Sequence, residues 1–166
     1  MKKILLFSLL LLSMGVFAES PYKHTIGFSA GSMNALSHKV LFNHFAVQTD
    51  AGCEITLFDG NTMGIFKINP MFMYQGTMYE DLYGNQINWF TGGGVSLGFM
   101  DSRLGDSSSN YIGGEFGLNA IAGIEFAFNR ALALSLDFRP GYGLWFQEDA
   151  ESFFDWGFQL GLHFYL

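Results

Sequence analysis

The segment that decides the fold is FDWGFQLGLHFYL, which runs from Phe154 to Leu166. Every second residue from Phe154 is apolar, whereas the residues between them are mostly polar or glycine: Asp155, Gly157, Gln159, Gly161, His163 and Tyr165. This alternation predicts a β-strand, because successive side chains of a strand point to opposite faces. The segment is also long enough to cross a bilayer at a tilt of roughly 45°.

The same alternation recurs along the chain before this segment. Residues 132–146 and 115–128 set large apolar side chains against charges, serine and glycine. The pattern is weaker in residues 87–100, 63–75 and 46–58, and weakest in residues 33–41 and 23–30. Together these segments predict eight strands, which is an even number and the smallest size of known outer-membrane barrels. Residues 76–86 fit this strand pattern poorly. Either they form a long turn, or the number of strands before them is wrong by one.

The composition narrows the classes of protein that remain. The chain has 166 residues, of which 49% are hydrophobic and 14% charged, against about 25% charged in an average soluble domain. Disorder is excluded by the 17% of aromatic residues, and a disulfide scaffold by the presence of one cysteine, Cys53. The formal net charge of −7 argues against a nucleic-acid partner.

Large apolar residues on one face and small polar residues on the other suit lipid outside and a narrow lumen inside. The fold class we predict is therefore all-β: an eight-stranded antiparallel up-and-down transmembrane β-barrel. The alternative is a soluble periplasmic lipocalin-like barrel that binds an apolar ligand, in which the two faces are inverted.

The first 18 residues have the pattern of a secretory signal peptide. Lys2 and Lys3 precede an apolar run from Ile4 to Leu12, and Val16-Phe17-Ala18 supplies a cleavage site. We expect cleavage after Ala18, which leaves residues 19–166 as the barrel domain. Loss of the two lysines takes the formal charge from −7 to −9.

Three motifs carry a resemblance to a known family: NWFTGGG at residues 88–94, LSLDFRP at 134–140 and LHFYL at 162–166. With the signal peptide, they resemble the small eight-stranded outer-membrane β-barrels of Gram-negative bacteria, the OmpX-like and opacity-protein-like group. The resemblance implies an outer-membrane location and a structural, surface-interaction or restricted small-solute role. It implies as partners outer-membrane lipid, lipopolysaccharide and the barrel-assembly machinery. It also implies that Phe164 and Leu166 form the assembly signal, although Leu166 departs from the commoner Phe.

Several charged residues fall on the predicted inner face. They are Lys39, Asp50, Glu54, Lys67, Glu115, Glu125, Asp137, Arg139 and Asp155. An eight-stranded barrel is just wide enough for its side chains to fill, so charges inside it must pair. The simpler interpretation is an ion-pair network that fixes strand register. A narrow polar path or a small-cation site is the alternative, because carboxylates outnumber bases. The inward glycines predict curvature and room for inward rings; an emptied lumen that admits a small ligand is their alternative interpretation.

The remaining residues indicate no reaction. The four histidines form neither a Ser/His/acid pattern nor a metal spacing, so we expect no enzyme, no catalytic or metal site and no cofactor. Met63, Met71 and Met73 are predicted to fill the lumen. We expect a monomer whose polar loops at residues 101–114 and 147–152 form the interaction surface. The candidates for interfacial aromatic girdles are Trp89, Tyr142, Trp145, Trp156 and Tyr165.

Overall fold

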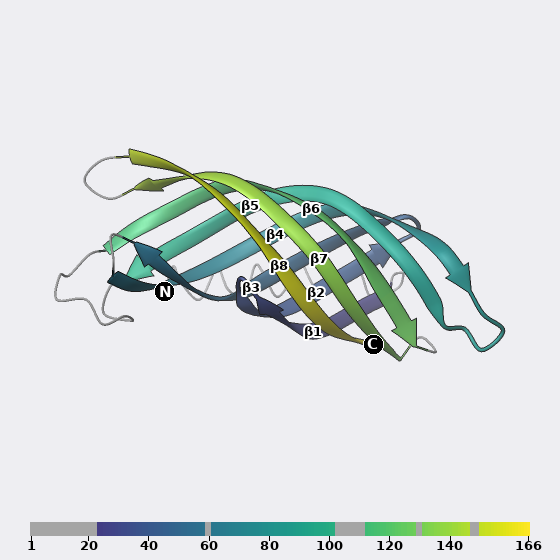
Figure 1. Ribbon diagram of the computed structural model, residues 1–166. Helices are drawn as coiled ribbons and strands as arrows, with labels where there is room; N and C mark the ends of the chain where they lie inside the picture. The colour runs from purple at the N-terminus through teal and green to yellow at the C-terminus, as the bar shows by residue number, and fades with distance from the viewer. Residues whose placement is uncertain (1–22, 59–60, 102–111, 129–130, 147–149) are drawn as a thin grey trace, which may run out of the picture.

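The computed structural model describes residues 23–58, 61–101, 112–128, 131–146 and 150–166. Eight antiparallel strands close into one barrel, as Figure 1 shows. The strands are β1 Lys23–Gly31, β2 Asn34–Phe42, β3 Phe45–Phe58, β4 Asn61–Glu80, β5 Gln86–Asp101, β6 Ile112–Phe128, β7 Leu132–Phe146 and β8 Ala150–Tyr165. The predicted all-β, eight-stranded antiparallel barrel is confirmed. The predicted signal peptide lies outside the described residues.

Pairing between the first and last strands closes the ring. The register of β1 with β8 runs from Thr25 opposite Tyr165 to Gly31 opposite Gln159. Leu166 adds one more bond at the end of β8, where its backbone N–H donates to the carbonyl of His24 at 2.8 Å. Closure leaves no open sheet edge around the barrel wall, which removes the site at which another chain could add a strand.

Side chains alternate between the two faces of the wall as the sequence predicts. In β7, Leu134 and Leu136 are exposed on the outside, whereas Ser135 and Asp137 between them are buried inside. The same order holds in β1, where Ile26 and Phe28 point outward. Because one face is large and apolar and the other small and polar, a shift of one residue in register would invert both faces.

The chain between residues 76 and 86 is mostly strand, which corrects the prediction of a long turn there. β4 continues to Glu80 and β5 begins at Gln86, so only residues 81–85 turn. The register shifts between Thr77 and Tyr79, which marks a β-bulge. A bulge breaks the period of two, and the alternation in the sequence therefore stops short of the end of the strand. The strand count itself was correct.

Two strands begin at least three residues earlier than predicted. β6 starts at Ile112 and not at Glu115, and β8 starts at Ala150 and not at Phe154. We call the end of the barrel that holds Leu166, the β2–β3 turn and the β4–β5 turn the C-terminal mouth (Figure 1). The other end, which holds the β1–β2 turn at Ser32, is the opposite mouth.

A close approach explains one of the inward glycines. A Cβ atom on Gly123 would lie 2.6 Å from Cζ of Phe90, so the ring of Phe90 occupies the space above the glycine. Gly123 pairs with Phe90 across β5 and β6. Glycine therefore lets a large ring lie flat against the neighbouring strand inside the barrel.

Candidate functional site

The predicted charged residues all lie on strands that face the lumen. Lys39 comes from β2, Asp50 and Glu54 from β3, Lys67 from β4, Glu115 and Glu125 from β6, Asp137 and Arg139 from β7, and Asp155 from β8. All are buried or half-buried. The lumen is therefore the candidate functional site, and its geometry follows from which of these charges meet.

The ion pair nearest the C-terminal mouth crosses the whole lumen. Lys39 Nζ lies 2.7 Å from Glu125 Oε2, and both side chains are only 2% exposed. Their strands, β2 and β6, stand four places apart in a ring of eight and so on opposite sides. Gln75 and Asn88 donate to the other carboxylate oxygen, Glu125 Oε1, at 2.9 and 3.5 Å. The buried carboxylate is thus both paired and hydrogen-bonded, as burial of a charge requires.

A second bridge crosses the lumen between β3 and β7, which are also opposite in the ring. Arg139 donates through Nη1 to Asp50 Oδ2 at 2.5 Å and through Nε to Asp137 Oδ1 at 2.5 Å. Gln48 Nε2 donates to both oxygens of Asp50 at 3.0 and 3.1 Å. The planar guanidinium serves the carboxylates of Asp50 and Asp137 at once, through separate N–H groups held in a fixed geometry.

The third cluster lies toward the opposite mouth. Lys67 Nζ is 2.7 Å from Glu54 Oε2 and 2.9 Å from Glu115 Oε1. Asp155 makes no ion pair with any residue that the structure describes. It lines a cavity of about 30 Å³ together with Glu54, Glu115 and Arg139. That space is about the volume of one water molecule.

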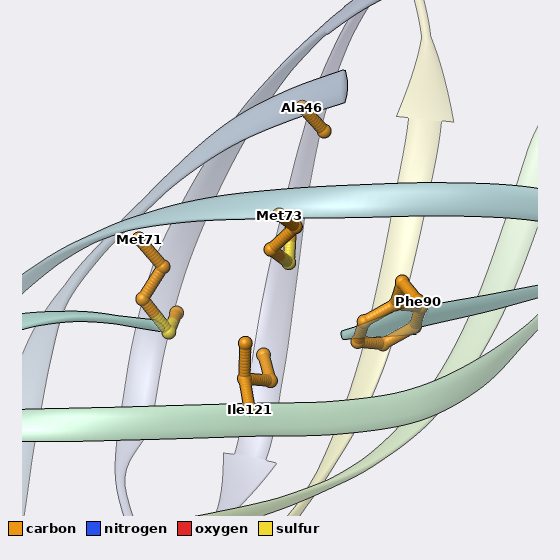
Figure 2. Close-up of a cluster of buried hydrophobic side chains, with 5 residues drawn as sticks. All are labelled: Ala46, Met71, Met73, Phe90 and Ile121. Carbon is orange, nitrogen blue, oxygen red and sulfur yellow. The ribbon is translucent and has the colours of Figure 1, made fainter. Parts of the chain in front are cut away.

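A layer of apolar side chains fills the lumen beside these pairs. Figure 2 shows Met71 and Met73 of β4, Phe90 of β5 and Ile121 of β6 directed toward one another, with Ala46 of β3 above them. Lys39 Nζ lies over the ring of Phe90, 5.3 Å from its centroid. Met71 and Met73 thus occupy the lumen as predicted. The prediction for Met63 concerns a side chain that lies outside the described part of the structure. Apolar residues on the inner face therefore occupy part of the lumen that polar side chains would otherwise line.

The outer face carries three of the five predicted girdle aromatics. Trp89, Tyr142 and Trp156 are exposed on the outside of the barrel. Trp145 and Tyr165 face the lumen, so their assignment to a girdle was wrong. The ring of Trp145 lies 4.9 Å from that of the inward Phe153, and the hydroxyl of Tyr165 lies 3.5 Å from Glu125 Oε1.

The parity of the two strands explains this correction. Both residues stand at odd positions of β7 and β8, alongside the inward Asp137 and His163. Residue type suggested a membrane interface, but the period of two was the better guide. The predicted assembly residues Phe164 and Leu166 lie at the C-terminal mouth and are exposed.

The described residues offer few groups for other chemistry. Within those ranges, no three His, Cys, Asp or Glu side chains are arranged to hold a metal ion. No helix among the described residues is long and apolar enough to cross a membrane. Most of the predicted interaction loops, residues 102–111 and 147–149, lies outside the described residues.

A larger cavity opens at the C-terminal mouth, where it has a volume of about 340 Å³. Its lining is mainly polar and includes Gln75, Thr77, Gln86 and Asn88 from β4 and β5. Sequence reasoning missed this cavity, because part of its wall is the stretch of β4 that runs past the start of β3, from Gln75 to Thr77.

Comparisons with known proteins identify the fold. No protein-family model and no curated protein matches the chain. Among solved structures, the chain is similar to Neisserial surface protein A (NspA), with a TM-score of 0.59 and 13% sequence identity. The match covers 86% of this chain and 93% of the other. At this identity the likeness is one of fold alone, and the fold that the two chains share is the closed antiparallel β-barrel described above.

Proposed function

We propose that this chain is an integral β-barrel of the bacterial outer membrane, exported through a cleaved signal peptide. One observation carries the proposal: apolar side chains are exposed all around the outside of the barrel. Phe28 on β1, Leu118 on β6 and Leu160 on β8 are 61%, 60% and 64% exposed. An apolar surface of this extent is costly in water, whereas hydrocarbon accepts it and accepts a closed barrel with no free edge.

The inner face supports the same proposal against a soluble barrel. A lipocalin-like protein needs an apolar cavity inside and polar residues outside. Here buried ion pairs such as Lys39–Glu125 and Arg139–Asp50 occupy the interior of the described barrel. The soluble alternative is therefore not favoured.

We further propose that the lumen is closed, so that the protein serves as a membrane-held scaffold or surface protein and not as a general porin. Two ion pairs span the lumen between opposite strands, and the layer around Phe90 fills the space beside them. Eight strands leave no wide aqueous channel once their side chains are in place. Restricted passage of water or a small cation along the acidic side chains is the lesser alternative.

The resemblance to the OmpX-like and opacity-protein-like group supplies the rest of the proposal. Lipid and lipopolysaccharide surround the barrel, and the barrel-assembly machinery recognises Phe164 and Leu166 during biogenesis. The protein acts as a monomer, without nucleic acid, cofactor or enzymatic activity. Both assembly residues remain exposed in the closed barrel.

Tryptophan quenching by lipid tests the membrane proposal. Three single-tryptophan variants, which retain Trp89, Trp156 or Trp145, are refolded in vesicles that contain lipids brominated along the acyl chain. The outward Trp89 and Trp156 should be quenched strongly and the inward Trp145 weakly. Acrylamide in the aqueous phase is the control for exposure to water. Equal quenching of all three, or no quenching, would contradict the proposal.

Bilayer conductance tests the closed lumen. The refolded protein should carry no porin-like current, and Phe90→Ala combined with Arg139→Ala should raise the current by opening the centre of the lumen. Phe138→Ala is the matched control, because Phe138 is also a phenylalanine but lies on the outer face. A porin-like current through the unmodified protein would reject the closed lumen.

A further inference from the structure

The cavity at the C-terminal mouth, which we call the cup, has one wall that extends beyond the end of β3. The last pair between β3 and β4 is Phe45 with Tyr74, yet β4 runs on to Glu80 while paired with β5. This continuation carries Thr77 and Gln86 past the end of β3, and both line the cavity. The segment of residues 76–86, which fitted the predicted strand pattern poorly, therefore forms one side of a cavity of about 340 Å³.

The floor of the cup is closed, and its carboxylate is already satisfied. Glu125 pairs with Lys39 and accepts hydrogen bonds from the amides of Gln75 and Asn88. The negative charge at the base of the cup is therefore neutralised within the barrel. No cation from solution is needed to balance the charge of Glu125.

One polar atom at this floor has no partner. Gln75 is only 8% exposed, and its Nε2 is used by Glu125, but its Oε1 accepts no hydrogen bond from any described residue. Gln75 lines the cup, but this oxygen is shielded from solvent, so its side chain must turn toward the cup before a bound group can donate to it. Buried acceptors are rarely left unpaired in folded proteins.

The lining restricts the chemistry of what the cup can hold. Amide, hydroxyl and imidazole groups from Asn43, His44, Thr77, Gln86 and Asn88 offer both donors and acceptors. Leu41 and the ring of Tyr165 are the apolar groups among the described lining residues, so most of what a ligand can contact is polar. Lys23 at the rim disfavours a cation, and this single ammonium is a weak basis for a phosphate site.

We infer that the cup at the C-terminal mouth binds a neutral polyhydroxylated ligand of the size of one or two sugar units. A hydroxyl group donates and accepts at once, which matches a lining of amides and hydroxyls and supplies the donor that Gln75 Oε1 lacks. The volume lies at the lower end of the range for small-molecule sites, about 300–1,000 Å³. The inference needs only the barrel fold and does not depend on the proposed membrane role.

Titration of the refolded barrel, followed by amide NMR, tests the inference. The micelles are made of a zwitterionic detergent, because detergents with sugar head groups would compete for the cup. Glucose and N-acetylglucosamine are the probes, and inorganic phosphate is the comparison ligand. At least one of the two sugars should give saturable shifts at the amides of Gln75, Asn88 and Thr77, while phosphate should bind there more weakly.

Variants assign the binding to the cup. Gln75→Leu should weaken sugar binding about tenfold, the equivalent of one hydrogen bond to a buried acceptor. Gln48→Leu is the matched control, because Gln48 is also a buried glutamine that donates to a carboxylate but does not line the cup. Should Gln75→Leu fail to fold, Thr77→Val at the wall should still weaken binding about two- to tenfold.

Three results would overturn the inference. The first is shifts that rise linearly with both sugars and never saturate, which would mean that the cup holds only water. The second is an equal loss of binding in Gln48→Leu, which would place the effect in the stability of the barrel. The third is tighter binding of phosphate than of either sugar, which would make Lys23 the dominant group and the cup an anion site.

Discussion

Replacing an outward leucine with arginine tests most directly the proposal that the outer wall faces the membrane. Leu136 lies four residues after Leu132, the first residue of β7 at the C-terminal mouth. At about 3.4 Å per residue and a tilt of roughly 40°, this separation places Leu136 about 10 Å along the barrel axis from that rim. An apolar belt about 25 Å tall has its midplane about 12 Å from its edge. Leu136→Arg therefore puts a guanidinium close to the midplane.

Among the described residues, the cross-strand neighbours of Leu136 offer this guanidinium no partner. The residues paired with Leu136 are Ile124 and Leu160, and both are apolar and exposed. We expect Leu136→Arg to lower the free energy of unfolding in vesicles by about 2–4 kcal/mol, which is about a 30- to 700-fold change in the folding equilibrium. Leu132→Arg, the same substitution on the same strand at the rim, should cost about 0–1 kcal/mol because an arginine there reaches the interface.

Reversible denaturant unfolding in lipid vesicles, followed by tryptophan fluorescence, measures both variants. The difference between them is the decisive quantity, since it isolates depth in the bilayer from the change of side chain. Ser135→Arg on the inner face should also destabilise the barrel, but by overfilling the lumen, and its cost should persist in detergent micelles. Equal stability of Leu136→Arg and Leu132→Arg, or no loss in either, would refute the assignment of the outer face to lipid.

Lys39→Met should destabilise the barrel by about 3–5 kcal/mol, because it leaves the buried Glu125 without its cation, and addition of Glu125→Gln should restore part of the loss in the same unfolding assay. We expect the C-terminal mouth to face the periplasm. In a chain whose native cysteine is replaced, an impermeant maleimide applied to intact cells should then label Ser32→Cys at the opposite mouth and spare His44→Cys; labelling of His44→Cys alone would place the C-terminal mouth outside the cell. Hydrogen bonds from the Asn85 side chain and from backbone N–H groups lower the pKa of Asp81 in the β4–β5 turn. This turn should therefore keep its full stability above the usual pKa of an aspartate and lose it as the pH falls through the lowered value. The loss is measured as reduced protection of the turn amides from hydrogen exchange, and Asp81→Ala should show the same reduced protection at every pH.

Most of the wall could be predicted from the sequence. Alternation is a local property, so the large apolar residues from Phe154 to Leu166 identify an outward face without knowledge of any neighbour. The same logic assigned Leu134 and Leu136 to the outside and Asp137 to the inside. It failed where the period of two was interrupted, at the bulge between Thr77 and Tyr79, and where residue type was preferred to parity, at Trp145 and Tyr165.

The interior depended on tertiary structure. The sequence by itself determined that charges such as Lys39 and Glu125 face inward, because each follows the parity of its own strand. Their partnership is a matter of ring closure, since residues 86 positions apart meet at 2.7 Å only when β2 and β6 stand on opposite sides of a closed barrel with one particular register. The cup at the C-terminal mouth has the same origin, because it exists where β4 outruns β3, and the length of one strand beyond another is set by pairing between strands. Local patterning thus decided which residues lie on the outer face and which face the lumen, whereas long-range register decided which of them touch.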